Sequence, residues 1–358
     1  MANDPTITGI AGYAGKYEKK LLARLINKLE LKANGITVVP GVKSKLTFTK
    51  LVIGKGAKPY TGVHKAKSDI SYEGNTLEVK DCQRDLTVEP KKYRTTYLEE
   101  MRGKGENANN MTIPFAQFTN EQIVDNLAAE IHDGTIWDGV GIAGFTAYSG
   151  VATYAVGDLI TFTQDGEVRY FECVEITLAG ESPDTDPDKW VWAGAKALCL
   201  GLKKILTDAA AAGDVQVIAT GAVSASNGYA KFSQMFRELP IPVRSNDKGF
   251  VEIICSWTDY FHLADDFEDK VTKNIEVIDG VTYLAKTNKK CIIKPVDWLT
   301  SRRLIATIPG NLKMVTDEES DMATIRTIAN MYTLDMGITW VMGFGAQDYE
   351  AMAISDQA

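Results

Sequence analysis

Apolar residues recur with helical spacing in two segments of the chain. In residues 17–31 they come every three or four positions, with charged residues between them. Residues 119–134 repeat this pattern, begin with Thr119 and Gln122 at the spacing of a capping box, and end at Gly134. Such spacing places apolar side chains on one face of a helix, and the terminal residues satisfy free backbone groups. We therefore expect an amphipathic helix over each segment.

Apolar residues alternate with polar ones at Leu46 and Phe48 within residues 45–53, and again at Leu77, Val79, Leu86 and Val88 within residues 75–90. A tip rich in Gly, Lys and Pro lies between them at residues 54–62. Alternation on both sides of a turn-forming segment predicts a long β-hairpin. The hairpin has few apolar residues for its length, so it cannot bury a core of its own. We expect it to project and to pack on something else.

Residues 146–194 interrupt this organisation. They are strand-like and rich in turn residues, with almost no helical spacing. Helical spacing returns at residues 195–214, and from there to the end short helices alternate with strands. The whole is a mixed α+β pattern rather than a regular βαβ repeat. Residues 146–194 therefore look like a small β unit inserted into a larger α+β protein.

Charge is distributed unevenly along the chain. The 358 residues are 45% apolar and carry a formal charge of −8, which is ordinary for a globular protein and argues against a nucleic-acid-binding surface overall. The exception is the segment from Gly41 to Ile70, which has one acid, Asp69, and seven lysines: Lys43, Lys45, Lys50, Lys55, Lys58, Lys65 and Lys67. A local basic arm favours an acidic partner, either nucleic acid or another copy of the same chain.

The five cysteines lie far apart and form no CxxC pair. This spacing argues against a zinc knuckle or a redox pair and predicts free, buried thiols in a reducing cytoplasm. The first residues lack a basic segment followed by an apolar one, and no run of about 18 apolar residues occurs. We therefore expect a protein made in a cytoplasm, with no membrane partner.

Residues typical of catalysis are scarce. The three histidines, His64, His132 and His262, are isolated from one another, and no GxSxG, P-loop or GxGxxG motif follows a strand. The acidic run at residues 316–321 offers oxygen ligands for a divalent cation, but it lacks the spacing and the central glycine of an EF-hand loop. A solvated turn, or the acidic side of a subunit contact, is the simpler interpretation. We expect no enzyme activity, no catalytic residue, no metal and no cofactor.

The order of these elements, together with one short motif, resembles a known family. The segment IPGNLKMVTDEESDMATIR at residues 308–326 is similar to a segment near the C-terminus of tailed-bacteriophage major capsid proteins of the Hong Kong 97 type, a fold shared with encapsulins. In that family an NL-x-x-GTD-x-x-SD run precedes the last strands. Val315 stands here where a glycine is usual. The resemblance covers nearly the whole chain outside residues 146–194.

This resemblance implies an α+β tailed-phage major capsid fold with a small all-β insertion domain. The helix at residues 119–134 would be the spine helix of the peripheral domain. The other parts would be an N-terminal arm at 1–40, an extended β-hairpin loop at 41–90, a peripheral domain at 91–145 and 300–358, the inserted β module at 146–194, and an axial domain at 195–299.

The same resemblance implies a structural function. The chain would assemble with itself into hexamers and pentamers of an icosahedral phage head that encloses double-stranded DNA without specific binding. Further partners would be a portal and scaffolding or decoration proteins, and the site of action would be the virion. The seven lysines of the hairpin loop would then face a neighbouring subunit. An encapsulin-like compartment shell is the alternative that the sequence leaves open.

A second resemblance concerns residues 148–194. They are similar to the small chitin-binding-type module appended to chitinases, with matches at Tyr148, Tyr154, Gly157, Asp158, Phe162, Gly166, Tyr170, Thr177, Gly180, Pro183 and Trp190. Phe171 and Glu172 depart from that pattern. The resemblance implies aromatic faces that stack on a surface glycan, with Tyr154, Trp190 and Trp192 as candidates.

The alternative for these aromatic residues is a structural role. A unit this small buries little surface and needs its aromatic rings as a core, which is the favoured interpretation for Trp190. Trp192 would point to the same face of an extended strand and is no better a candidate. If the module does bind sugar, the chain could instead be a carbohydrate-binding adhesion or tail-associated virion protein.

Overall fold

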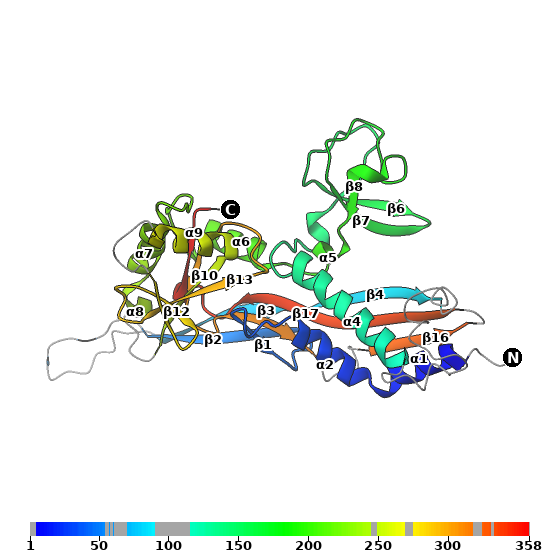
Figure 1. Cartoon of the computed structure of the whole chain (residues 1–358), viewed down its shortest axis with the longest axis horizontal. Coiled ribbons are helices and arrows are strands. Elements are labelled where there is room, and N and C mark those ends of the chain that lie inside the picture. The colour runs from blue at the N-terminus through cyan, green and yellow to red at the C-terminus, as the bar shows by residue number, and fades with distance from the viewer. Residues whose placement is uncertain are drawn as a thin grey trace.

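The protein has a mixed α+β fold with a projecting hairpin and a small β module that stands off the body (Figure 1). The computed structural model describes residues 5–53, 57, 60, 70–89, 115–244, 249–268, 275–317, 324–330 and 333–357. Four of the predicted contact lysines, Lys55, Lys58, Lys65 and Lys67, lie outside the described residues. Most of the acidic run, residues 318–321, also lies outside them.

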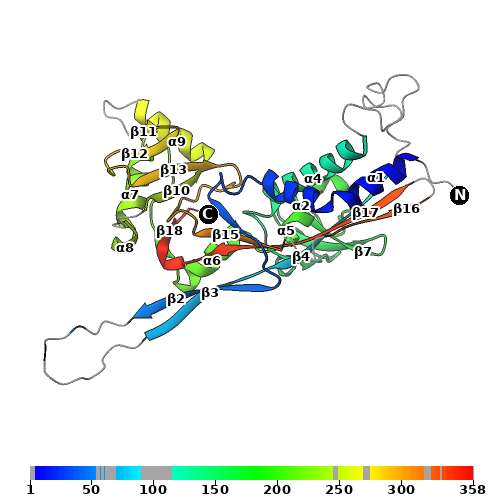
Figure 2. The same ribbon diagram turned by 90° about the horizontal axis from the view of Figure 1, so that it is seen from below.

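A five-stranded sheet and three helices form one part of the body. Its strands are β1 (Ile36–Val39), β15 (Leu312–Thr316), β17 (Leu334–Ala346) and β16 (Thr324–Ala329) in that order, with β4 (Lys80–Val88) also paired to β17. One face is covered by helices α1 (Pro5–Lys16), α2 (Glu18–Lys28) and α4 (Phe115–Gly134) (Figure 2). The core between them contains Leu25, Ile131 and Trp340.

Helix α4 begins earlier than its sequence predicts. It starts at Phe115, so Thr119 lies buried inside the helix and the predicted capping box is wrong. Helix α4 packs against α1 and α2, and tertiary packing outweighs a local capping preference. Arg24 of α2 fixes this contact, because its guanidinium donates to both carboxylate oxygens of Asp125 at 2.7 and 2.8 Å.

A seven-stranded sheet forms the second part of the body. Its order is β11 (Ile275–Ile278), β12 (Val281–Leu284), β13 (Cys291–Val296), β10 (Val251–Ser256), β14 (Ile305–Thr307), β18 (Met352–Ser355) and β9 (Gln216–Ile218). The helices of this part are α7 (Gly228–Glu238), α8 (Ile241–Arg244) and α9 (Trp257–Glu268). Helix α6 (Leu202–Ala212) leads into β9 but buries Leu202 and Leu206 in the first core, where it contacts β17. Every residue of β10 is buried, and Phe232 and Leu263 join its core. Residues after 300 divide between the two sheets, because β14 and β18 belong to this one.

Two strands form the projecting hairpin. Strand β2 (Lys45–Ile53) pairs in antiparallel register with β3 (Ile70–Glu78). The hairpin ends at Glu78, and the chain continues after Val79 as β4 in the five-stranded sheet. The alternating segment at residues 75–90 is therefore shared between two sheets. Figure 2 shows β2 and β3 leaving the body on the side away from α1, α2 and α4.

The inserted module is a four-stranded sheet in the order β5 (Thr146–Ala147), β6 (Leu159–Gln164), β7 (Glu167–Cys173) and β8 (Trp190–Trp192). It has its own small core, which contains Tyr154, Ile160, Cys173 and Trp190. Short helix α5 (Gly194–Ala197) follows β8 and joins the module to the body (Figure 1).

All five cysteines are free and buried, as their spacing predicted. Burial raises the pKa of the Cys82 thiol to about 12 and shifts the other four pKa values in the same direction. These thiols therefore stay protonated near neutral pH and act as small apolar groups.

Candidate functional site

The root of the hairpin packs closely against strand β17 of the five-stranded sheet. Leu77 packs with Val42 and Val315 in a small apolar cluster of its own. Strand β3 crosses β17 at two glycines. A Cβ at Gly343 would collide with the carbonyl group of Glu78, and one at Gly345 would collide with the side chain of Leu77. These glycines let the hairpin approach the sheet closely and so fix where it leaves the body.

Farther out, the same face of the hairpin makes polar contacts with the body. The Lys50 ammonium group donates to Asp348 Oδ2 at 3.0 Å and to Glu350 Oε2 at 2.6 Å. The side-chain amide of Asn75 donates to the carbonyl oxygen of Ala346. The hydrogen bond to Glu350, with a further contribution from Asp348, raises the pKa of Lys50 above its ordinary value. The lysine is therefore charged near neutral pH.

The three predicted contact lysines that the structure describes differ in their surroundings. Lys43 is exposed. Lys45 pairs with Glu78 across the hairpin, and Lys50 pairs with the body of its own chain. For Lys50 this corrects the expectation that the lysine is free to face a neighbour, because its charge is already matched by Asp348 and Glu350.

The opposite face of the hairpin carries exposed apolar side chains that sequence reasoning missed. Leu51 is opposite Tyr72 and Ile53 is opposite Ile70 in the strand register. Their exposed fractions are 51%, 75%, 63% and 61% respectively. We call these four residues the hairpin patch. A detectable signal existed, because the apolar positions of β2 change phase: Leu46 and Phe48 face inward, whereas Leu51 and Ile53 face outward.

The five-stranded sheet presents an open face opposite its helices. On β4, Arg84 points toward α4, where it pairs with Glu130 at 3.0 Å. Alternation then places Asp81 and Asp85 on the other face, where they line a shallow groove over Gly337 with Arg326 on its far side. The hairpin leaves the body on this same helix-free side (Figure 2).

Two of the three predicted sugar-stacking rings are not available. Tyr154 is 8% exposed and Trp190 is 6% exposed, and their rings meet edge to face with centroids 5.4 Å apart. The Tyr154 hydroxyl also accepts a hydrogen bond from the Ser149 amide at 2.7 Å. Both rings are needed as core because the module has few other apolar residues, so the expectation of stacking is wrong for them.

Trp192 differs from Trp190, although both lie on the same face of the sheet. Its side chain is 55% exposed, because the loops of the module cover only the Trp190 end of that face. Its ring stands perpendicular to Phe171 at 6.0 Å, Phe171 meets Phe162 at 6.5 Å, and Phe162 meets Tyr148 at 5.4 Å. We call these four rings the aromatic strip.

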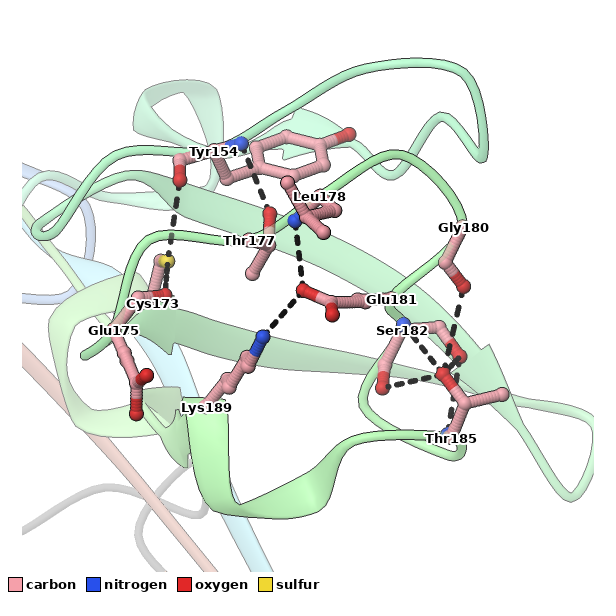
Figure 3. A network of polar contacts seen from close by, with 10 residues as sticks. All are labelled: Tyr154, Cys173, Glu175, Thr177, Leu178, Gly180, Glu181, Ser182, Thr185 and Lys189. Carbon is pink, nitrogen blue, oxygen red and sulfur yellow. Dashed lines mark hydrogen bonds and ion pairs between the residues drawn. The ribbon is translucent and has the colours of Figure 1, made fainter.

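The loop before β8 is held by a polar network (Figure 3). The hydroxyl of Thr177 accepts from the Tyr154 amide at 3.0 Å, and Glu181 accepts from the Leu178 amide at 2.7 Å while pairing with Lys189 at 2.5 Å. The pairing with Lys189 holds the pKa of Glu181 below its ordinary value. The Thr, Glu and Lys residues of this stretch therefore shape a loop that has little regular secondary structure.

The module is mounted rigidly on the body by the segments that enter and leave it. Val140 and Leu200 form an antiparallel bridge, and the Gly201 amide donates to the Gly139 carbonyl at 2.8 Å. A Cβ at Gly201 would lie 2.5 Å from the Trp137 carbonyl oxygen and 2.6 Å from the Gly139 nitrogen. Only glycine permits this backbone contact, which we call the clamp. It places the two ends of the insertion side by side, as an insertion into a folded body requires.

Among the described residues, no group of three or more His, Cys, Asp or Glu side chains could hold a metal ion. Within the same part of the chain, no helix is both long and apolar enough to cross a membrane. His132 lies beside Asp133, and His262 belongs to α9, so the two are not brought together. His64 lies outside the described residues.

The chain is similar to solved shell structures over most of its length. It is 13% identical to the satellite phage P4 procapsid including size determination (Sid) protein, with a TM-score of 0.49 and coverage of 96% of this chain and 90% of that one. For the capsid of Myoviridae phage XM1 the identity is 11%, the TM-score 0.47 and the coverage 91% of each chain. For the holo-SrpI encapsulin complex from Synechococcus elongatus PCC 7942 they are 7%, 0.43, and 90% and 84%.

No protein-family model matches the chain, and no curated protein sequence matches it. The TM-scores are all below 0.5, so we base the proposed function on the geometry of the chain itself.

Proposed function

We propose that this chain is the major shell protein of a tailed-phage head, assembling with copies of itself into hexamers and pentamers. The observation that carries the proposal is the hairpin patch. Leu51, Ile53, Ile70 and Tyr72 are more than half exposed on an element that projects from the body. An apolar group in this position gains burial only against another molecule. A second copy of the chain is the partner that a repeating shell supplies.

The open sheet face is the surface on which we place the neighbour's hairpin. It lies on the side to which the hairpin projects, and Asp81 and Asp85 give it acids that suit the lysines of a basic arm. The hairpin and this face are different surfaces, so the contact joins copies head to tail. Head-to-tail contacts close into rings when the rotation between copies permits it, which is the geometry of a hexamer or a pentamer.

The shell would enclose double-stranded DNA without specific binding. The formal charge of −8 suits a wall that does not adhere to a packed polyanion. In this proposal the residues before 40 form the arm, the two sheets anchor the peripheral and axial domains, and the module stands on the outside. Portal, scaffolding and decoration proteins would be partners in the virion. An encapsulin-like compartment shell, which holds cargo in place of DNA, is the competing form of the same proposal.

Electron microscopy of the purified chain after size exclusion tests this proposal. We expect rings or closed shells, each subunit bearing one outward knob where the module stands. Copurified nucleic acid or protein cargo would separate a phage shell from a compartment shell. A subunit that stays monomeric over a wide range of protein and salt concentrations would contradict the proposal.

The aromatic strip favours a second function for the module, the binding of a surface saccharide. Trp192 offers an open ring to the apolar face of a pyranose, and Phe171 and Phe162 continue the same line. At the far end, Gln164 donates to Asp184 at 2.7 Å and accepts from Arg169 at 2.5 Å, which gathers planar polar groups suited to sugar hydroxyls. This candidate does not require a shell, and it would also suit an adhesion protein.

Replacing Trp192 with alanine tests this second function. We expect affinity for soluble chitin oligosaccharides to fall at least about tenfold, since loss of one stacking ring removes roughly 1.4 kcal/mol or more. Titration calorimetry of the intact chain measures this change. Val168→Ala is the matched control, because Val168 is 59% exposed on the neighbouring strand β7 and points to the face opposite Phe171 and Trp192. Absence of binding by the unmodified chain would rule out chitin-type sugars, and equal losses in both variants would rule out the strip.

A further inference from the structure

The hairpin is attached to the body at two levels of different strength. The inner level is apolar and tight, with Leu77 wedged over Gly345 and a backbone hydrogen bond from the Val42 amide to Thr316 at 3.1 Å. The outer level is polar and consists mainly of Lys50 with Asp348 and Glu350. The two levels therefore respond differently to salt and to substitution.

In the outer level, the turn that carries Asp348 and Glu350 is held by hydrogen bonds that do not involve Lys50. Asp348 Oδ1 accepts from the Glu350 amide at 3.0 Å, which fixes the short turn that carries both carboxylates. The Asp348 amide donates to Asn311 Oδ1 at 2.8 Å, and Asn311, itself 2% exposed, donates back to the Asp348 carbonyl at 2.8 Å. One oxygen of Asp348 thus holds the turn and the other faces Lys50. The Asp348 carboxylate therefore stays in place whether or not the lysine occupies it, and the backbone of Glu350 stays beside it.

Within the described part of the hairpin, Lys50 is the outermost side chain that forms an ion pair with the body. The residues beyond it on the two strands are the exposed hairpin patch, the exposed Ser71 and the half-buried Val52. A two-stranded ribbon without a packed face is marginally stable in water. The direction of the outer hairpin therefore depends on the Lys50 contact more than on its own hydrogen bonds.

This contact is also weak enough to open. The side chains of Lys50, Asp348 and Glu350 are 40%, 30% and 73% exposed, and ion pairs exposed to this degree contribute little and are screened by salt. Glu73 and Asp214 line the same shallow pocket, so the lysine has further carboxylates nearby when it moves. Opening would leave the apolar root unchanged.

We propose that Lys50 is a positioning residue that acts as a releasable ionic latch, fixing the direction of the hairpin without contributing much to the stability of the fold. Closed, it holds the hairpin patch at one height above the body. Open, it lets the outer hairpin bend about its root, so that the patch reaches a neighbour placed differently. The consequence for assembly rests on the proposed shell function, whereas the latch itself is a property of the single chain.

Hydrogen exchange of the full chain, isolated as unassembled subunits, tests the latch directly. In Lys50→Gln we expect amides of residues 50–53 and 70–73 to exchange about fivefold faster, the factor that corresponds to a partly exposed ion pair. Amides of β10 and β17 should not change. Lys50→Arg should keep the protection, because it preserves the charge.

Lys45→Gln is the matched control. It removes the Lys45–Glu78 pair, which lies within the hairpin and does not include Asp348 or Glu350. We expect no acceleration in residues 50–53 from this change. A rise from about 0.05 to 0.5 M salt should accelerate exchange in the unmodified chain but not in Lys50→Gln, since the Debye length shrinks severalfold.

Three results would overturn the latch: unchanged exchange in Lys50→Gln, equal acceleration in Lys45→Gln, or the same salt response with and without Lys50. None of these measurements depends on shell formation. Failure of the latch would therefore leave the proposed shell function standing, and the reverse also holds.

Discussion

Replacing Ile53 and Ile70 together with aspartate should abolish assembly while leaving the subunit folded. The two side chains face each other across the hairpin and are 63% and 61% exposed, so neither contributes to the core. Burying each at a neighbour is worth about 1.5–3 kcal/mol, and an unpaired buried carboxylate costs more. Each subunit contact should therefore weaken by at least about two orders of magnitude. Electron microscopy and size exclusion should show single subunits with an unchanged thermal unfolding midpoint.

A control variant separates this effect from a general increase in negative charge. Ile176→Asp combined with Leu178→Asp adds the same charge at two side chains of the module, each 67% exposed. Because the module stands apart from the hairpin, this variant should assemble as the unmodified chain does (Figure 1). Shells formed by the hairpin variant, or shells lost in the module variant, would contradict the proposed contact.

Replacing Gly201 with valine should strongly destabilise the subunit. Its Cβ would lie within 2.6 Å of backbone atoms of Trp137, Gly139 and Thr135, and backbone atoms in a paired segment cannot move aside as a flexible side chain can. We expect a loss of about 3 kcal/mol or more, near the upper end of the usual range for single substitutions. The thermal unfolding midpoint should fall by about 4 °C or more for a chain of 358 residues.

Gly150→Val serves as the comparison for this substitution. No atom lies within 4 Å of a Cβ at Gly150, which is in an exposed loop of the module. Its unfolding midpoint should stay within about 1 °C of the unmodified chain, as is usual for surface positions. A stable Gly201→Val variant would show that the clamp is looser than its backbone contacts indicate.

The general architecture was predictable because apolar periodicity reports local burial. The spacing of Leu127 and Ile131 and the alternation of Leu46 and Phe48 identified a helix and a strand that the structure contains. The boundaries were less predictable. Helix α4, which packs against α1 and α2, begins at Phe115 rather than after Thr119, and the segment after Asn75 divides between two sheets. The division arises because β4 pairs with β17, a partner distant in sequence.

The candidate sites were predictable in kind but not residue by residue. Trp190 and Trp192 share a strand face, yet one is buried and the other is open, since loops from elsewhere in the module cover only one end of that face. Lys50 is part of a basic segment, but its partners Asp348 and Glu350 lie almost three hundred residues away. Sequence spacing carries no information about such contacts. The outward orientation of Leu51 and Ile53 follows from the change of phase along β2, whereas the charge of the segment predicts only that lysines are exposed.

The clamp also defines a place where the chain can accept a different inserted domain. Val140 and Leu200 are bridged partners, so the two cut ends lie about 5 Å apart, as in any antiparallel pair. A compact domain whose own termini are that close would replace the module without stretching the body. Because two backbone connections set its orientation, such an inserted domain would be displayed at a fixed angle rather than on a flexible linker. If the subunits form a shell, the clamp would give a regular array of identically oriented fusions.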